Sequence, residues 1–199
     1  MKKCRICKVK FEPFNSLHVA CSLECAQEVA IKDLERRDAR RAKAQRKWVR
    51  EQKERIKPRR DWIKEAQKEF NSFIRARDAH LPCICCGEWG KDEQWKPGGQ
   101  YDAGHYLSVG SHPELRFDEA NCHKQLKSCN AGEGKYAHKR RTVGEEYRLR
   151  LIEKIGVSEV ERLEGPHEPK KYTIDDLKEI KAKYRALARE IQKERGRHD

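Results

Sequence analysis

The stretch YDAGHYLSVGSHPELRFDEANCHKQLKSCNAGEG, residues 101–134, holds the densest group of metal-binding and proton-transfer side chains in the chain. It begins with Asp102 and His105, passes through a short apolar run at 115–117, and leads to Asn130 near its end. The first residues of the stretch predict a strand, and residues 115–117 predict the second strand of a hairpin. Asn130 marks the predicted start of a helix. This order of strand, strand and helix around one metal decides the fold that we expect.

The residue types in this stretch suit phosphodiester hydrolysis. That reaction needs a base to activate water and a cation to neutralise the charge that develops on the phosphate. His105 has a ring that titrates near neutrality, while Asp102 and Asn130 offer oxygen ligands for Mg²⁺ or Mn²⁺. We expect the side-chain carbonyl of Asn121 to fix the tautomer of His105. His123 is a second candidate to reach the phosphate or the metal, although each of these residues alone also has an ordinary structural role.

Charge and composition limit the class of protein. The 199 residues have a formal net charge of +13, with 40% charged and only 8% aromatic residues. So little apolar material predicts small local cores, metal sites and long solvated helices. The positive charge predicts a polyanionic partner, and nucleic acid is favoured over a membrane. The basic residues have no apolar helical face beside them, and no run approaches the roughly 20 apolar residues of a membrane span.

The first cysteine cluster predicts a closed structural zinc site. The chain starts without an apolar leader segment, so we expect a cytoplasmic protein whose cysteines bind metal rather than form disulfides. A C-x2-C pair is followed by a C-x3-C pair that opens a helical pattern. The expected ligands are Cys4, Cys7, Cys21 and Cys25.

The second cluster, CICCG at 83–87, predicts another structural zinc. Cys83 and Cys86 have the C-x2-C spacing, which leaves Cys85 as the odd thiol, although an exchange between Cys85 and either neighbour stays open. The remaining ligands must come from further along the chain. Cys129 is the expected third ligand, and the fourth is either Cys122, the better candidate, or His123.

A basic helical arm is predicted between the two clusters. Residues 27–80 contain no glycine and a single proline, Pro58, which predicts two helices with a break there. Thirteen basic and three acidic residues between 36 and 60 give a local net charge of +10. We interpret the first helix as an arm that contacts DNA phosphates, with a solvated linker helix as the alternative. The expected contacts are Arg36, Arg37, Arg40, Arg41, Arg46, Lys47 and Arg50.

The run DAGHYLSVGSHPELRFDEANCHKQLKSCNAGEG, with the preceding CICCG, resembles the NinG (Rap) family of lambdoid phage recombination endonucleases, and the resemblance extends over the whole chain. It implies an HNH-like ββα-metal nuclease related to endonuclease VII-type resolvases, which cuts branched DNA such as Holliday junctions and D-loops. The expected location is then the host cytoplasm. It implies His105 as general base, oriented by Asn121, Asp102 and Asn130 as Mg²⁺ or Mn²⁺ ligands, and Glu133 as an acidic helper.

This chain departs from the pattern of that family at two positions. Gly104 precedes the base where many HNH nucleases have Asp or His, and Leu126 stands where zinc-containing members often begin a C-x2-C pair.

Basic residues follow the 101–134 stretch, and we expect them to bind DNA beside the site: Lys135, Lys139, Arg140 and Arg141.

The C-terminal part predicts three helices. The first covers 145–155, the second opens with a capping box at 158–161, and the last runs from a Thr173 cap to about Arg195. The apolar face of the last helix packs on the nuclease domain or forms a homodimer interface, since symmetrical cutting of a four-way junction needs two active sites.

The expected fold is therefore α+β and mostly helical, with a small ββα-metal core, zinc knuckles and long basic helices. The expected domains are a zinc knuckle at 1–27, a basic helical arm at 28–80, a nuclease domain at 81–144 and C-terminal helices at 145–199. The alternative function is a non-catalytic, zinc-stapled DNA- or RNA-binding protein in which His105 is structural.

Overall fold

The computed structural model describes residues 1–90, 99–131 and 140–197, and it places side chains in the last range from residue 143. It is mostly helical, with two small two-stranded sheets. The chain divides into two compact units, residues 1–57 and 58–199. None of the described helices is long and apolar enough to cross a membrane.

The first unit is a small hairpin followed by a long helix. Strands β1 (Lys2–Lys3) and β2 (Lys10–Phe11) pair antiparallel, and α1 (Leu23–Arg55) follows. The Ser22 hydroxyl caps α1 by accepting a bond from a backbone amide of its first turn. Within α1 only Val29 is buried, so the helix is solvated along most of its length. Its small core consists of Cys4, Ala20 and Val29, with Ile6, Phe11, Val19 and Cys25 packed against it.

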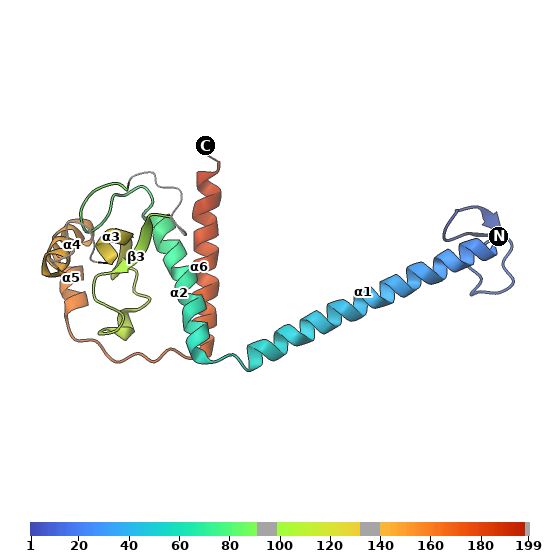
Figure 1. Ribbon diagram of the computed structural model, residues 1–199, viewed down its shortest axis with the longest axis horizontal. Coiled ribbons are helices and arrows are strands. Elements are labelled where there is room, and N and C mark those ends of the chain that lie inside the picture. Colours follow the sequence, from blue (N-terminus) through green and yellow to red (C-terminus); the bar gives the residue numbers. More distant parts are fainter. Residues whose placement is uncertain (91–98, 132–139, 198–199) are drawn as a thin grey trace. The chain divides into compact units, whose positions relative to one another are not determined.

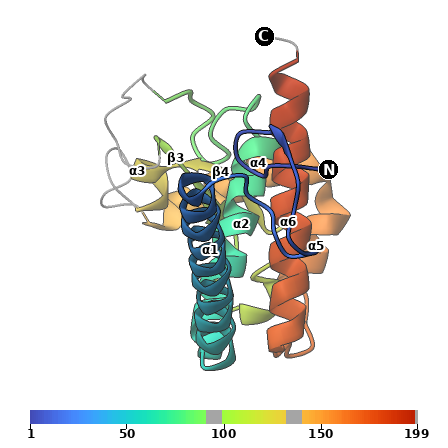
Figure 2. The same ribbon diagram turned by 90° about the vertical axis from the view of Figure 1, so that its right-hand side faces the viewer.

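Two parallel helices form one layer of the second unit. α2 (Arg59–Arg77) begins after Pro58, as the sequence predicts, and α6 (Ile174–Arg195) begins with the predicted Thr173 capping box. The helices lie side by side (Figures 1 and 2). Two ion pairs of 2.7 Å join them: Lys181 with Glu65, and Arg185 with Glu69.

The apolar face of α6 is used inside the chain. Leu177, Tyr184 and Ala188 are buried against α2 in a core that includes Trp62 and Phe70. Of the two roles expected for this face, packing within the chain is therefore the one observed. The expected homodimer stays a prediction.

A two-stranded hairpin lies next to α2. β3 (Tyr101–His105) pairs antiparallel with β4 (Cys122–Leu126), with Asp102 opposite Gln125 and His105 opposite Cys122. The short helix α3 (Lys127–Asn130) follows β4 directly.

The second strand was expected at 115–117, and that prediction is wrong. Residues Pro113–Leu115 form the 3-10 turn η1 instead. Leu115 and Phe117 are both buried, but they anchor the connecting segment in two different cores rather than on one sheet. The true strand, CHKQL, was hidden because its polar residues are buried with specific partners, which hydrophobic patterning does not detect.

The other face of the hairpin is covered by α4 (Arg140–Ile155) and α5 (Val157–Glu164), as Figure 1 shows. The buried Tyr147 hydroxyl of α4 donates to the backbone carbonyl of Gly104, 2.9 Å away. Gly156, at φ 86°, separates the helices and caps α5 two residues before the expected cap at 158. The hairpin is thus held between an α2–α6 layer and an α4–α5 layer.

Candidate zinc sites and hydrolytic residues

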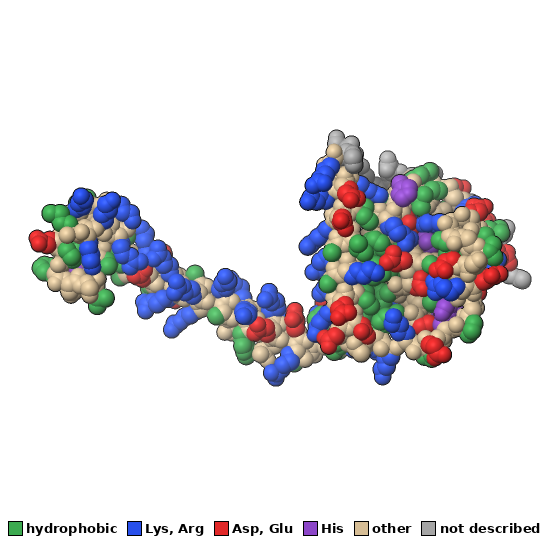
Figure 3. Space-filling model, turned by 180° about the vertical axis from the view of Figure 1, so that it is seen from behind, with side chains coloured by type: hydrophobic (Ala, Val, Ile, Leu, Met, Phe, Trp, Pro, Cys, Tyr) green, Lys and Arg blue, Asp and Glu red, His purple; other side chains and the backbone are tan. Residues whose placement is uncertain are grey.

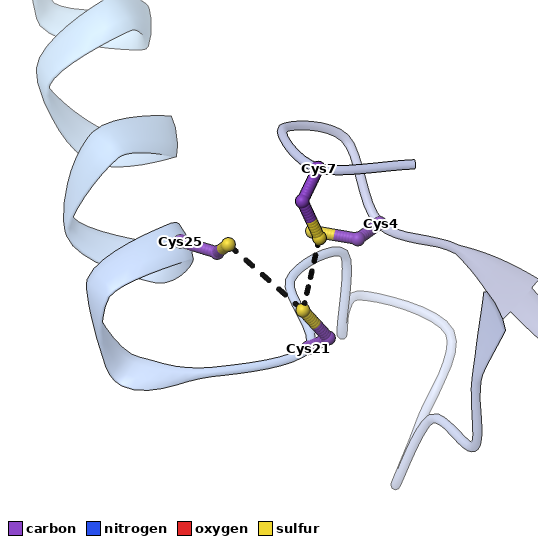
Figure 4. Close-up of side chains that lie close together, drawn as sticks. All are labelled: Cys4, Cys7, Cys21 and Cys25. Carbon is purple, nitrogen blue, oxygen red and sulfur yellow. Dashed lines mark hydrogen bonds between the residues drawn. The ribbon is translucent and has the colours of Figure 1, made fainter. Parts of the chain in front are cut away.

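The first cysteine cluster has the geometry of a tetrahedral zinc site. The sulfur atoms of Cys4, Cys7, Cys21 and Cys25 lie within 4.8 Å of one another (Figure 4). Four zinc–sulfur bonds of about 2.3 Å in a tetrahedron place the sulfur atoms about 3.8 Å apart, which is within this limit. Although burial raises the pKa of Cys4, backbone amides that include that of Ile6 lower it to about 6, which favours the thiolate that zinc binds. The cluster can therefore hold zinc.

The second cluster contains three buried thiols. The sulfur atoms of Cys83, Cys86 and Cys129 lie within 4.8 Å of one another. The backbone amide of Leu126 donates to the Cys83 sulfur at 3.2 Å, the kind of bond that stabilises a thiolate in a zinc knuckle. The structure thus brings together the expected pair, Cys83 and Cys86, and the expected third ligand, Cys129. This cluster can also hold zinc.

The two knuckles are built on the same backbone turn. Lys8 follows Cys7 at φ 65°, and Gly87 follows Cys86 at φ 71°. The amide of Lys8 donates to the Cys4 carbonyl at 3.1 Å, and the amide of Gly87 donates to the Cys83 carbonyl at 2.8 Å. Left-handed backbone is uncommon for lysine, and Lys8 is the sole non-glycine residue with a positive φ in the described ranges. The recurrence of one turn at both pairs supports a shared metal-binding role.

Cys122, expected as the fourth ligand of the second cluster, lies elsewhere. It is buried in the core between the hairpin and α2, and its sulfur is 3.8 Å from Nδ1 of His105. Burial raises the pKa of Cys122, so the thiol stays protonated and unsuited to zinc. Cys85 also lies outside the cluster, as expected for the odd thiol of the CICCG run. Its sulfur is 3.8 Å from the Val143 carbonyl. Among the described residues the second cluster has three thiols.

His105 lies at the end of β3 and is half-buried. Its Nε2 is 3.0 Å from the backbone carbonyl of Arg116. A carbonyl only accepts, so Nε2 carries the hydrogen and Nδ1 keeps the lone pair. The ring stacks beside Phe70 with centroids 6.3 Å apart. Burial lowers the pKa of His105, which keeps the ring neutral at pH 7, the form that a general base requires.

Asn121 does not touch His105, contrary to the expected direct contact. It is fully buried, and its Oδ1 accepts from the Leu107 amide at 2.8 Å. Its Nδ2 donates to the carbonyls of Leu107 and Leu115, at 3.1 and 3.3 Å. These bonds fix the connecting segment beside Arg116, whose carbonyl holds His105. The connection between Asn121 and His105 therefore runs through the backbone of this segment.

Asp102 and Asn130 lie together, but away from His105. Nδ2 of Asn130 donates to Oδ2 of Asp102 at 3.1 Å, at the surface. β3 pairs in unbroken register, so residues three apart point to opposite faces, about 10 Å apart along the strand. His105 shares its face with Ala103, which packs on α2. The expected convergence of His105 with both oxygen ligands on one metal is thus a wrong prediction.

His123, the second candidate for catalysis, is a structural residue. It is fully buried, and its Nε2 donates to the Ala120 carbonyl at 2.9 Å. Its Nδ1 accepts from Arg77 at 3.0 Å and from Lys154 at 2.9 Å. Both ring nitrogens are engaged inside the protein, and burial lowers the pKa of His123. Neither a zinc ion nor a phosphate can reach this ring.

The network around His123 centres on Asp78, which sequence reasoning missed. Asp78 ends α2 with a side chain 3% exposed and pairs with Arg77 at 2.8 Å and Lys154 at 2.9 Å. Burial raises the pKa of Asp78, but the neighbouring His123, Arg77 and Lys154 hold the pKa of this carboxyl well below its usual range. The sequence shows that Arg77 precedes Asp78 at the end of a predicted helix, which could have suggested an ion pair. Nothing in the sequence shows that Lys154 lies next to Asp78.

The basic arm expected to contact DNA is the helix α1. Figure 3 shows lysine and arginine side chains gathered along it. Arg36 pairs with Asp33 at 3.4 Å and Lys47 with Glu51 at 3.8 Å, both at exposed positions where ion pairs contribute little. No ion pair is found in the described part of the chain for the other expected contacts, and all of them are exposed: Arg37, Arg40, Arg41, Arg46 and Arg50.

Several expected site residues cannot be placed. Glu133, Lys135 and Lys139 lie outside the described residues, and Arg140 and Arg141 start α4 at positions whose side chains are not described.

The comparisons with known proteins agree over nearly the whole chain. A family model described as the bacteriophage lambda NinG protein matches residues 1–194. Protein ninG of Escherichia phage 933W is 36% identical over 98% of this chain and 96% of its own length. Protein ninG of Salmonella phage P22 is 36% identical, covering 96% and 92%, and that of Enterobacteria phage H19B is 38% identical, covering 91% and 89%. No solved structure matches. A match of this extent shows that the chain belongs to the NinG family of lambdoid phages.

Proposed function

We propose that this protein is a metal-dependent endonuclease that cuts branched DNA, such as Holliday junctions and D-loops. The observation that carries the proposal is His105: a neutral, half-buried imidazole at a strand end, with its hydrogen committed to the Arg116 carbonyl and its lone pair on Nδ1. A hydrogen bond of this kind selects the tautomer and orientation of a general base. The hairpin and the helix start that follow it resemble the order of a ββα-metal nuclease.

His105 is the residue that removes a proton from the attacking water. Asn121 is a positioning residue, since it holds the segment whose carbonyl orients the ring. Nucleophilic attack in this arrangement leaves a 5′-phosphate and a free 3′ hydroxyl. The basic residues of α1 supply attraction to the DNA backbone that is independent of sequence. Zinc at the cysteine clusters stabilises the fold and takes no part in the reaction.

Asp102 and Asn130 are the oxygen donors that fit a Mg²⁺ or Mn²⁺ ion. Their side chains meet at 3.1 Å at the surface, and carboxylate and amide oxygens are suitable ligands. An ion held by these two side chains would supply positive charge to a phosphate that contacts this surface. Because the pair lies on the opposite face of β3 from His105, an ion held there is separated from the base by the width of the hairpin.

That separation favours a second candidate, a zinc-stapled DNA- or RNA-binding protein without catalysis. Such a protein needs the basic surface and the cysteine clusters but no convergence of base and metal ligands. In this function His105 serves only to join the end of β3 to the Arg116 segment.

Cleavage of synthetic four-way and three-stranded DNA distinguishes the two functions. The full chain, its His105→Ala variant and a matched control, His80→Ala at an exposed position after α2, are assayed with Mg²⁺ or Mn²⁺ and with a chelator of these ions. We expect His105→Ala to lose about 10²–10⁴ in rate with DNA binding retained, and His80→Ala to cut like the wild type. A wild type that binds but never cuts establishes the binding protein. A His105→Ala variant that cuts normally removes the assigned base.

A further inference from the structure

One flank of α2 carries polar and basic side chains, and an ion pair along it joins Arg60 to Asp61 at 3.8 Å in the first turn. Ala66, Phe70 and Ile74 of α2 are buried in the core, and Glu65 and Glu69 face α6, where they pair with Lys181 and Arg185. The other flank of the buried row is polar, with spacings of three and four that keep its members on one side of the helix. We call these residues the α2 stripe: Arg60, Lys64, Gln67, Asn71 and Arg75.

Two half-buried arginines at this flank differ from the others in the second unit. Arg75 and Arg116 form no ion pair with a carboxylate in the described part of the chain. Burial lowers the pKa of Arg116, and the positive charge of Arg59 acts in the same direction. A desolvated guanidinium without an anion is costly. The other half-buried arginines all reach a carboxylate: Arg77, Arg148, Arg150 and Arg185.

Arg116 lies next to His105, and Arg75 extends the same polar flank of α2. The backbone carbonyl of Arg116 binds the ring, and its guanidinium donates to Oε1 of Gln67 at 3.3 Å. Gln67 in turn donates to Asn71 at 2.7 Å, so Arg116 continues the polar flank of α2. Arg75 lies one helical turn beyond Asn71 on the same flank of α2.

We propose that one strand of the DNA lies along the α2 stripe, and that Arg116 and Arg75 bind the phosphates that flank the bond presented to His105. This inference rests on the proposed function and adds to it a contact surface distinct from α1. Residues 60–75 span about 22 Å of helix, the length of about six nucleotides. A phosphate supplies the missing counter-ion, and arginine binds it with two parallel hydrogen bonds. The neutral Gln67 and Asn71 between them donate without repelling the strand.

The test is the binding of a labelled four-way junction to the full chain without a divalent cation, over a range of salt concentrations. The double variant Arg75→Gln, Arg116→Gln is compared with Arg189→Gln, which removes an exposed arginine of α6. We expect the double variant to bind the junction about ten- to a hundredfold more weakly. The slope of the logarithm of the binding constant against the logarithm of the salt concentration should become less steep by about 1.8, because each phosphate that is no longer bound accounts for about 0.9. The control should change affinity less than about twofold. The exposed Lys64→Glu variant, which leaves buried packing intact, should weaken binding in the same way.

Cleavage is a second, independent readout. Arg116→Gln keeps the backbone carbonyl that holds His105, so a loss of about 10²–10³ in rate reports the side chain alone, and Arg116→Lys should restore part of it. Unchanged affinity and salt dependence in both the double variant and Lys64→Glu overturn the stripe, even if the wild type cuts DNA. A weakened double variant of a wild type that never cuts supports the stripe and overturns the nuclease. A wild type that binds no junction overturns both. Circular dichroism of each variant verifies its fold.

Discussion

Replacing Asp78 with asparagine should destabilise the second unit far more than any exposed acidic substitution. Asp78 joins the end of α2 to α4 through Lys154, and its Oδ2 also accepts from the Lys124 amide of β4 at 3.2 Å. It is therefore the group that holds the hairpin of His105 between the two helical layers. Asp78→Asn keeps the shape of the side chain and removes only its charge.

The magnitude follows from the two ion pairs. Arg77 and Lys154 have side chains 25% exposed, so both would be left as largely desolvated cations. Each charge-assisted bond contributes about 2 kcal/mol, and breaking a buried pair by removing one partner typically costs about 3–5 kcal/mol. We expect the free energy of unfolding to fall by about 4 kcal/mol, which corresponds to a decrease of about 10–15 °C in Tm.

Urea unfolding followed by tryptophan fluorescence measures this change, because Trp62 is buried in the second unit. Asp175→Asn is the control: Asp175 pairs with Lys178 at 2.9 Å but is 85% exposed, so its loss should cost under about 1 kcal/mol. Equal losses in the two variants would refute the argument that burial makes the Asp78 pairs strong.

The pH dependence has a definite sign. The pKa of Asp78 in the folded state lies well below its usual range, while in the unfolded chain it is about 3.9. The stabilisation is therefore fully present above about pH 5 and is lost as the pH falls toward the folded-state pKa. The difference in unfolding free energy between wild type and Asp78→Asn should shrink below about pH 4. A difference that grows in acid would show that Asp78 is protonated in the folded protein.

Three further predictions concern the candidate sites. Zinc analysis should find one ion fewer in Cys129→Ala than in the wild type, and no loss in Cys122→Ala, whose sulfur lies outside the cluster. Asp102→Ala should retain cleavage within about tenfold, much closer to the wild type than His105→Ala, because the two residues occupy opposite faces of β3; equal losses would place one metal between them. Asn121→Ala should lower the free energy of unfolding by about 2–4 kcal/mol in urea melts, since three buried backbone groups lose their partner; a change below about 0.5 kcal/mol would deny it that role.

The sequence predicted the elements whose signals are local. The break at Pro58, the Thr173 capping box, the end of the last helix at Arg195 and the first cysteine cluster all depend on residues within a few turns of each other. Periodicity and capping chemistry describe such elements well.

The errors arose where distant residues decide the outcome. The strand at 122–126 buries His123 and Lys124, which partners distant in the sequence, among them Arg77, Lys154 and the Ala79 carbonyl, make tolerable. The sequence favours Cys122 over His123 as the fourth zinc ligand, whereas its position opposite His105 in the hairpin places it in a different core. Neither fact is readable from the chain before the fold is known.

The separation of Asp102 from His105, unlike these two features, can be predicted from the sequence alone. Once residues 101–105 are taken as a regular strand, alternation places positions three apart on opposite faces, whatever the tertiary structure. Only a β-bulge between them would bring both side chains to one face, and the unbroken pairing of Asp102 with Gln125 and His105 with Cys122 contains none. A strand and a shared metal were therefore incompatible expectations from the start. The structure keeps the strand, so a metal that serves His105 must take its protein ligands from residues other than Asp102.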